Sequence, residues 1–300
     1  MNTSQLSRIT EDKARAMLEH IRWPDDTVCP HCGVIGAYKL QPKATSQSPV
    51  RKGVWKCKSC QKQFTVTVGT IFEGSHISLR NWVYAFGRMC ASKKGISALQ
   101  LQRELGITYK TAWFVCHRIR YVMQDTIDTK LAGTVEVDET YVGGKPRYKG
   151  QSKRGRGTKK VPVLTLIERN GSARTRVVCD VNSKTLKGAI RKHIDVGAKI
   201  MTDDNPSYNG IGKEFGGGHE SVNHSAKEYA RNDGANINTA ESYFAIMKRG
   251  IYGTFHHVST RHLPRYCDEF DFRWNHRKID DGERTAAALA MAQGKRLSYA

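Results

Sequence analysis

The sequence has few acidic residues and no long apolar run, and both absences restrict its possible functions. Its 28 Asp and Glu residues stand against 49 Lys and Arg, so the formal net charge is +21. No stretch approaches the ~18 uninterrupted apolar residues of a membrane span, and the polar residues 1–10 lack the apolar segment of a secretory signal. We therefore expect a cytoplasmic, nucleoid-associated protein with no membrane partner, whose positive charge is neutralised by nucleic acid.

The cysteines do not form the pattern of a disulfide framework. Of the eight, four form two CxxC pairs, Cys29 with Cys32 and Cys57 with Cys60, and the others are scattered singly. Four thiolates give Zn²⁺ a closed tetrahedral shell, which is typical of a structural metal. The two pairs predict a zinc ribbon, followed by a strand over residues 63–68. A redox dithiol is the alternative interpretation.

A helix-turn-helix is predicted after the zinc ribbon. One amphipathic helix stops at Gly106, and a second begins after Thr108. Basic residues on the second helix are expected to contact the phosphates and base edges of double-stranded DNA: Lys110, Arg118 and Arg120. An ordinary helical hairpin is the alternative interpretation.

The remainder of the chain alternates β-rich runs with amphipathic helices, which predicts an α/β sheet. Between its first two strands, residues 143–160 carry eight basic residues and no acid. We expect a loop that is disordered when free and holds DNA phosphates, with Lys145 and Arg147 among its contacts. The predicted domains are a helix with a zinc ribbon (1–75), a helix-turn-helix region (76–127) and a catalytic domain (128–300).

Three acidic residues stand where a two-metal phosphodiester site would need them. Asp138 lies inside an apolar strand, Asp203 ends another, and Glu241 begins a helix. Carboxylates suit Mg²⁺ or Mn²⁺, and two such ions can activate a nucleophile and stabilise the leaving oxygen. Lys248, two turns beyond Glu241, is expected to grip the DNA backbone.

Other residues near these positions remain candidates. Glu136 shares a strand face with Asp138 and is the main rival ligand. Asp204 adjoins Asp203, which the Thr-Asp pattern favours. Arg273 and Arg277, one helical turn apart, are expected to face DNA.

The chain resembles the bacterial insertion-sequence transposases of the ISXO type from about Ala16 to Arg277. The motifs that carry the resemblance include CPHCG, WKCKSC, VEVDETYVGGK, TDDNPSY and NTAES. The resemblance implies a zinc ribbon joined to an RNase H-like catalytic domain. It further implies that Asp138, Asp203 and Glu241 occupy the DDE positions of that domain.

The function implied by this resemblance is that of a DNA transposase. Such an enzyme binds the ends of an insertion sequence, hydrolyses a phosphodiester at each end and joins the freed 3′-hydroxyl to target DNA. A homodimer or a higher synaptic multimer is expected by analogy. Some members have Asn at the third acid, so Asn238 remains an alternative ligand. A DNA-binding regulator with a relict catalytic domain and a nuclease that cleaves without joining remain alternative functions.

Overall fold

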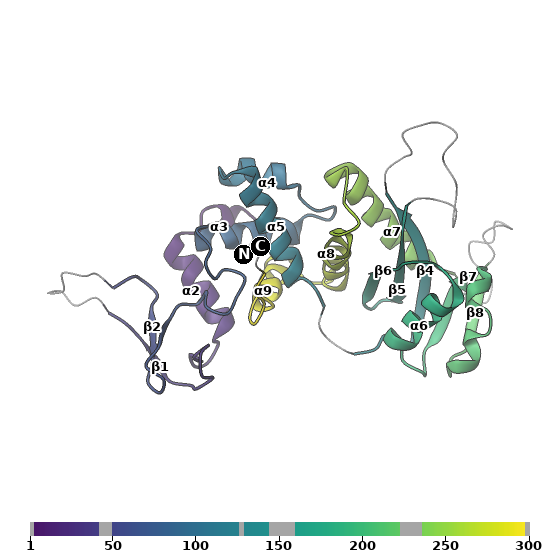
Figure 1. Cartoon of the computed structure of the whole chain (residues 1–300), viewed down its shortest axis with the longest axis horizontal. Helices are drawn as coiled ribbons and strands as arrows, with labels where there is room; N and C mark the ends of the chain where they lie inside the picture. The colour runs from purple at the N-terminus through teal and green to yellow at the C-terminus, as the bar shows by residue number, and fades with distance from the viewer. Residues whose placement is uncertain (1–2, 42–49, 126–128, 144–159, 223–235, 298–300) are drawn as a thin grey trace. The chain divides into compact units, whose positions relative to one another are not determined.

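The computed structural model describes residues 3–41, 50–125, 129–143, 160–222 and 236–297 (Figure 1). The chain divides into two compact units. Unit 1 consists of Met1–Ser92, Ile96–Met123 and Ile279–Ala300. Unit 2 consists of Lys93–Gly95 and Gln124–Lys278. In the described part of the chain, no helix combines the length and the apolar composition that crossing a bilayer requires.

Unit 1 begins with two helices, α1 (Thr3–Ser7) and α2 (Glu11–Arg22), that pack against α3 (Leu79–Ala91). The hydroxyl of Thr10 caps α2 by accepting a hydrogen bond from the Lys13 N–H (3.3 Å). The Glu11 carboxylate in turn accepts hydrogen bonds from the first two N–H groups of α3, both at 3.0 Å. One acidic residue of α2 therefore satisfies the otherwise unpaired start of α3.

The zinc-ribbon region contains a small antiparallel sheet of β1 (Ala37–Lys39), β2 (Trp55–Cys57) and β3 (Gln63–Phe64). The strand predicted over residues 63–68 ends at Phe64, and turns follow. Two contacts replace the strand ladder there. Arg22 donates to the carbonyl of Val66 (2.7 Å), and the hydroxyls of Thr65 and Thr67 are 2.7 Å apart. Local side-chain hydrogen bonds thus override the β-propensity of this run.

Helices α4 (Ala98–Leu105) and α5 (Tyr109–Val122) contact each other and lie on either side of the predicted turn. Gly106 ends α4 with a φ of 64°, a conformation that glycine adopts without steric cost. Thr108 caps α5. The two helices and their turn lie where they were predicted, whereas DNA binding by this pair remains a prediction.

The C-terminal helix α9 (Asp281–Ala290) packs against α3, so residues 279–300 belong to unit 1, although the sequence grouped them with the catalytic domain. Gly87 of α3 allows a close approach of its neighbours. A Cβ atom added at Gly87 would lie 2.2 Å from Leu6 and 3.8 Å from the Thr285 hydroxyl. Helix α9 buries Ala288 and Leu289 against this unit, and apolar burial of this kind explains its placement.

Unit 2 is built on a five-stranded sheet with the order β6-β5-β4-β7-β8. Its strands are β4 (Thr134–Val142), β5 (Val161–Glu168), β6 (Ala173–Val177), β7 (Lys199–Asp203) and β8 (His219–Val222). Strands β4, β5 and β6 pair antiparallel, whereas β7 and β8 extend the sheet parallel to β4. This mixed sheet confirms the predicted α/β class with RNase H-like strand order.

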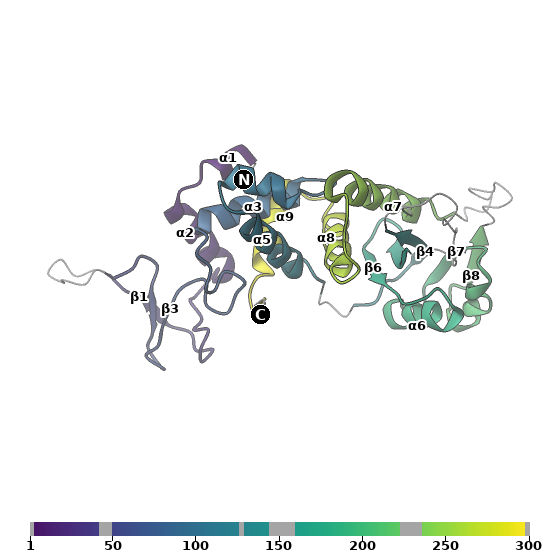
Figure 2. The same ribbon diagram turned by 45° about the horizontal axis from the view of Figure 1, so that its top comes forward.

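Helices cover both faces of this sheet (Figure 2). Helix α6 (Ser183–His193) packs on the face that presents Val135 and Val137 of β4. Helices α7 (Asn238–Gly250) and α8 (Leu263–Asn275) pack on the opposite face, with Val142 and Val163 in that core. Because side chains alternate along a strand, Glu136 and Asp138 face the α7 side.

Candidate metal centres

The four cysteines of the CxxC pairs lie together in unit 1, with all Sγ atoms within 4.8 Å of one another. The Sγ atoms of Cys29 and Cys60 are 3.7 Å apart, as are those of Cys32 and Cys57. Four sulfurs bound tetrahedrally at ~2.3 Å from Zn²⁺ would be ~3.8 Å apart, so the cluster fits zinc. The adjacent thiols affect one another: a hydrogen bond from the Cys60 N–H lowers the pKa of Cys57 to about 7, whereas burial and the neighbouring sulfurs raise the pKa of Cys32 to about 11.

Asp138 and Asp203 lie on neighbouring parallel strands of unit 2, as the sequence predicted. The ladder between β4 and β7 pairs Glu136 with Met201. Continuing that register by two residues on each strand sets Asp138 beside Asp203. Both side chains are half-buried, so their oxygens remain within reach of a ligand.

Glu241 is brought to the same face of the sheet by the start of α7. The Glu136 carboxylate accepts hydrogen bonds from the Thr239 hydroxyl (2.9 Å) and the Ala240 N–H (3.0 Å). It also pairs with Arg169 at 2.8 Å and is fully buried. These contacts hold the first turn of α7 against β4. Glu136, the rival ligand, therefore anchors the start of α7, the helix that carries Glu241.

Glu139 has a supporting role that the sequence did not indicate. Its carboxylate accepts hydrogen bonds from the Asn205 amide (2.6 Å) and the Tyr208 hydroxyl. Its backbone N–H donates to the Asp138 carboxylate (2.7 Å). A strand pattern gives no sign of this role, because it cannot reveal a partner that lies 69 residues away.

The acidic residues of this region affect one another electrostatically. Burial raises the pKa of Asp138 to about 8, with further contributions from Asp203, Glu139 and Glu241. Among the described residues, only the cysteines form a group of three or more potential ligands within 4.8 Å. The three predicted carboxylates are therefore neighbours that interact, and their spacing is more open than that of the zinc site.

Three other predicted or rival residues surround this group. Lys248 is half-buried on α7, with its ammonium 5.8 Å from the ring centroid of Phe244. Asn238 is the exposed first residue of α7, and its backbone N–H bonds to the Asn236 side chain (3.3 Å). Asp204 is exposed, unlike the half-buried Asp203.

The residues predicted to contact DNA on α5 differ in their positions. Lys110 is exposed at the start of the helix, as expected. Arg118 is half-buried and donates to the carbonyl of Ile71 (3.3 Å). Arg120 is 2% exposed, which corrects the expectation that it faces a ligand. It lies on the inner side of α5 because the amphipathic period carries it there.

The remaining predicted contacts are similarly divided. Arg273 is 7% exposed, pairs with Glu269 and stacks on Phe270, which corrects its expected position at the surface. Arg277 is half-buried and donates to the carbonyls of Gly171 (2.9 Å) and Trp274 (2.8 Å). Both arginines hold the fold together. The predicted contacts Lys145 and Arg147 lie outside the described residues.

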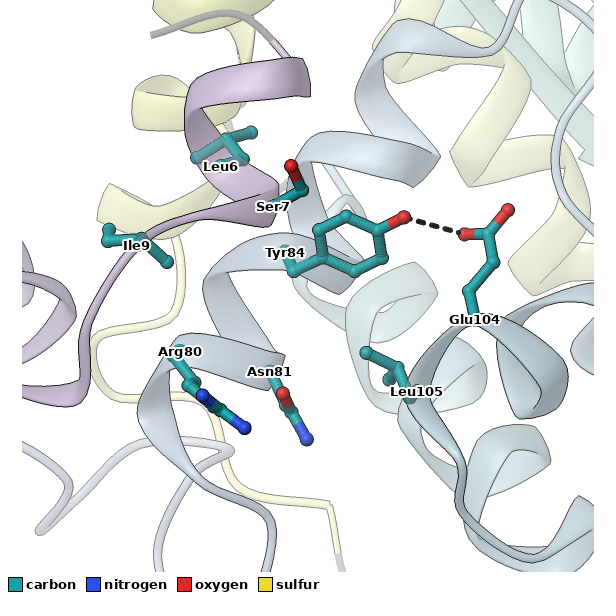
Figure 3. A pocket seen from close by; sticks show the side chains of 8 residues that line it. All are labelled: Leu6, Ser7, Ile9, Arg80, Asn81, Tyr84, Glu104 and Leu105. Atoms are coloured by element: carbon teal, nitrogen blue, oxygen red, sulfur yellow. Dashed lines mark hydrogen bonds between the residues drawn. The ribbon is translucent and has the colours of Figure 1, made fainter.

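A hollow of about 270 Å³ lies in unit 1 between α1, α3 and α4 (Figure 3). Its acidic residue, Glu104, accepts hydrogen bonds from Tyr84 (3.1 Å) and from Arg88 (2.9 and 2.8 Å). Because Arg88 neutralises Glu104, the exposed Arg80 gives the hollow its positive charge.

Segments of both units match families of known proteins. Residues 130–275 match the family model of the ISXO2-like transposase domain, and residues 9–63 match that of the transposase zinc-ribbon domain. A protein described as uncharacterised in the transposable element ISH50 of Halobacterium salinarum is 27% identical over 287 residues, covering 88% of this chain and 91% of that protein. A crystal structure of a pre-cleavage Mos1 transpososome shares 14% identity over 67% of this chain and 75% of that chain. The TM-score of this match is 0.27.

Proposed function

We propose that this chain, which matches the ISXO2-like transposase domain over residues 130–275, cleaves and joins DNA with divalent cations held by Asp138, Asp203 and Glu241. The observation that carries the proposal is geometric: Asp138 and Asp203 lie beside each other on parallel strands, and the start of α7, which carries Glu241, is held against β4. Keeping like charges together in a folded protein opposes stability unless a cation is bound between them. The raised pKa of Asp138, caused by burial and by neighbouring carboxylates, is typical of a functional site.

The residues of this chain would divide the chemistry among them. Bound Mg²⁺ or Mn²⁺ supplies Lewis acidity that activates a water or 3′-hydroxyl and stabilises the leaving oxygen. Asp138 and Asp203 would hold the cations from two adjacent strands, and Glu241 would do so from α7. Lys248 would neutralise a phosphate of the DNA backbone. No covalent intermediate on the protein is required.

The partners of this enzyme would be double-stranded DNA and further copies of the chain. Zinc-ribbon residues and the start of α5, with the exposed Lys110, would bind the terminal inverted repeats of the element. The net charge of +21 supports DNA as the polyanion. A homodimer or larger synaptic complex would bring two ends together, in association with the nucleoid.

The test is a strand-transfer assay with a labelled 3′-hydroxyl DNA end, a target duplex and Mg²⁺. Substituting Asp138→Asn, Asp203→Asn or Glu241→Gln should reduce joining by about 10³-fold or more, because each removes a ligand worth several kcal/mol. DNA binding should persist. The matched control is Asp204→Asn, at the exposed neighbour, which should retain activity. Full activity of the Glu241 variant with loss of activity in Asn238→Ala would move the third ligand to Asn238.

The same assay separates the proposal from its two rivals. Cleavage without a joined product would indicate a nuclease. DNA binding with neither product, in the presence of Mg²⁺ or Mn²⁺, would indicate a regulator. Joined product that depends on Asp138 and Asp203 is the outcome expected from a transposase.

A further inference from the structure

We infer that Glu139 is a positioning residue that sets the placement of Asp138 relative to Asp203, and thereby the affinity of this site for divalent cations. The inference rests on the proposed function, since it concerns the same carboxylates. It assigns to Glu139, Asn205 and Tyr208 a shared role that the DDE pattern does not include.

The side chain of Glu139 controls the segment that follows Asp203. Its two carboxylate oxygens accept from different donors, Oε1 from the Asn205 amide (2.6 Å) and Oε2 from the Tyr208 hydroxyl. Asn205 also uses its backbone N–H to bond the Asp203 carboxylate (3.1 Å). A displacement of Glu139 is therefore transmitted through Asn205 to Asp203.

The backbone of Glu139 acts on the other acid. Its N–H donates to Oδ1 of Asp138 at 2.7 Å, which restricts the rotation of that carboxylate. The same residue thus contacts Asp138 directly and Asp203 through one intermediate. Since the two acids belong to different strands, this link fixes their separation more tightly than the sheet ladder alone.

Tyr208 gives this network a rigid base. It is fully buried in the core that also contains Val137 and Leu186. Burial, together with the adjacent Glu139, raises the pKa of Tyr208 well above its usual value, so its hydroxyl keeps its proton. A buried phenol with one fixed partner cannot follow a moving carboxylate, and Glu139 is held in place.

The Glu139 side chain lies on the face of β4 opposite to that of Asp138, which distinguishes it from a direct ligand. Val137, two residues earlier, faces the α6 core, so alternation directs Glu139 to that side and Asp138 to the other. A carboxylate also suits the position better than an amide. Two donors converge on Glu139, whereas Gln would present its own NH₂ group to one of them.

The test measures cation binding directly, on the full-length zinc-loaded protein without DNA. Mn²⁺ titration followed by electron paramagnetic resonance reports the affinity of the carboxylate site. Tyr208→Phe and Glu139→Gln should each weaken Mn²⁺ binding by about 10- to 100-fold, the usual effect of losing an outer-shell partner. Raising the Mn²⁺ concentration to saturation should restore the strand-transfer rate of Tyr208→Phe.

A matched control is available in the same unit. Tyr243 is also buried, and its hydroxyl donates to the buried carboxylate of Asp271 (2.6 Å). Tyr243→Phe makes the same chemical change in a network with Thr175 and Asp271, neither of which is a proposed ligand. Tyr243→Phe should leave the Mn²⁺ affinity unchanged. A loss of affinity in Tyr208→Phe alone would then not be a general effect of losing a buried tyrosine hydroxyl.

The outcomes separate this inference from the proposed function. Wild-type Mn²⁺ affinity in Tyr208→Phe, or an equal loss in Tyr243→Phe, overturns the positioning role while leaving the function intact. Wild-type affinity in Asp138→Asn overturns the proposed site itself. If Glu139→Gln fails to fold, Tyr208→Phe still decides the question, because it preserves the shape of the core.

Discussion

The cysteine cluster of unit 1 and the carboxylate group of unit 2 are both candidate metal centres, and they are assembled in different ways. The cysteines come from two short CxxC segments and lie within 4.8 Å of one another. The carboxylates come from β4, β7 and α7 and do not reach that spacing among the described residues. Soft thiolates form a closed structural shell, whereas an open carboxylate group leaves room for substrate oxygens.

This difference shows where the contacts that support each of the two centres must lie. A CxxC turn carries two ligands within four residues, so local backbone geometry is enough to pair them. The carboxylates are supported by partners outside the proposed ligand set. Glu136 anchors the start of α7, and Glu139 links β4 to the segment after β7. Four predictions each affect one centre more than the other, and a fifth concerns the hollow of unit 1.

The largest effect is expected from Cys57→Ser. Losing one thiolate should abolish zinc binding, and structural zinc contributes about 10 kcal/mol or more to folding of small domains. Zinc content measured by atomic absorption should fall, and limited proteolysis should cut within residues 9–63. Cys179→Ser, at an exposed cysteine outside the cluster, is the control and should retain its zinc. If Cys57→Ser retained its zinc, the four cysteines would not form the proposed closed zinc site.

Glu136→Ala should destabilise unit 2 by about 3 kcal/mol, because it leaves Arg169 and the start of α7 without their buried partner. Urea unfolding measures this change in the free energy of unfolding. The control is Glu214→Ala, which breaks an exposed pair with Arg191 and should cost less than about 1 kcal/mol. Equal effects of the two substitutions would show that Glu136 is not an anchor.

The cation affinity of the carboxylate group should depend on pH. Burial and the neighbouring acids raise the pKa of Asp138 from 3.8 to about 8, and cations bind the ionised form. Mg²⁺ affinity should therefore rise by about tenfold per pH unit below pH 8 and level off above it. Calorimetry across this range measures the slope, which Asp138→Asn should remove.

The raised pKa of Asp138 also makes the stability of the cation-free protein depend on pH. The folded state binds the Asp138 proton more tightly than the unfolded chain does, because the pKa is higher in the folded state. This contribution is fully present below the unfolded pKa and is lost as pH rises towards about 8. A wild-type protein whose stability changes with pH no differently from Asp138→Asn would contradict the assigned environment.

The smallest effect is expected at the hollow of unit 1. If Arg80 contacts a DNA phosphate, Arg80→Ala should weaken DNA binding a few-fold and reduce the salt slope by about 1. Binding measured by fluorescence anisotropy at several salt concentrations gives this slope. Arg191→Ala removes an exposed positive charge from unit 2 and is the charge-matched control. Identical slopes for both variants would exclude a specific contact at Arg80.

Several features of the molecule could be predicted from the sequence because their signals are local or lie in long motifs. The CxxC pairs indicated the cysteine cluster, and Thr108 marked the start of α5. The resemblance to ISXO-type transposases is confirmed by the two matched domain models. The strand pattern also set the faces of Glu136 and Asp138 correctly.

Other predictions failed because exposure depends on packing partners that a charge does not reveal. Arg120 and Arg273 were assigned to a DNA surface by their charge and their helical positions, and both are buried. Long basic side chains can pack their stems in a core when a carboxylate or a carbonyl receives the guanidinium. Residues 279–300 were misgrouped for a related reason, since nothing in the sequence names α3 as the helix on which α9 packs.

The sequence by itself indicated the cysteine cluster, the α/β class, the resemblance to ISXO-type transposases and three acids on two strands and at a helix start. Only the tertiary structure showed which protein groups each of these acids contacts. Glu136, Asp138 and Glu139 are nearly adjacent carboxylates in one strand, and their chemistry is the same. Their roles differ because the start of α7, the end of β7 and the buried Tyr208 approach them from different sides.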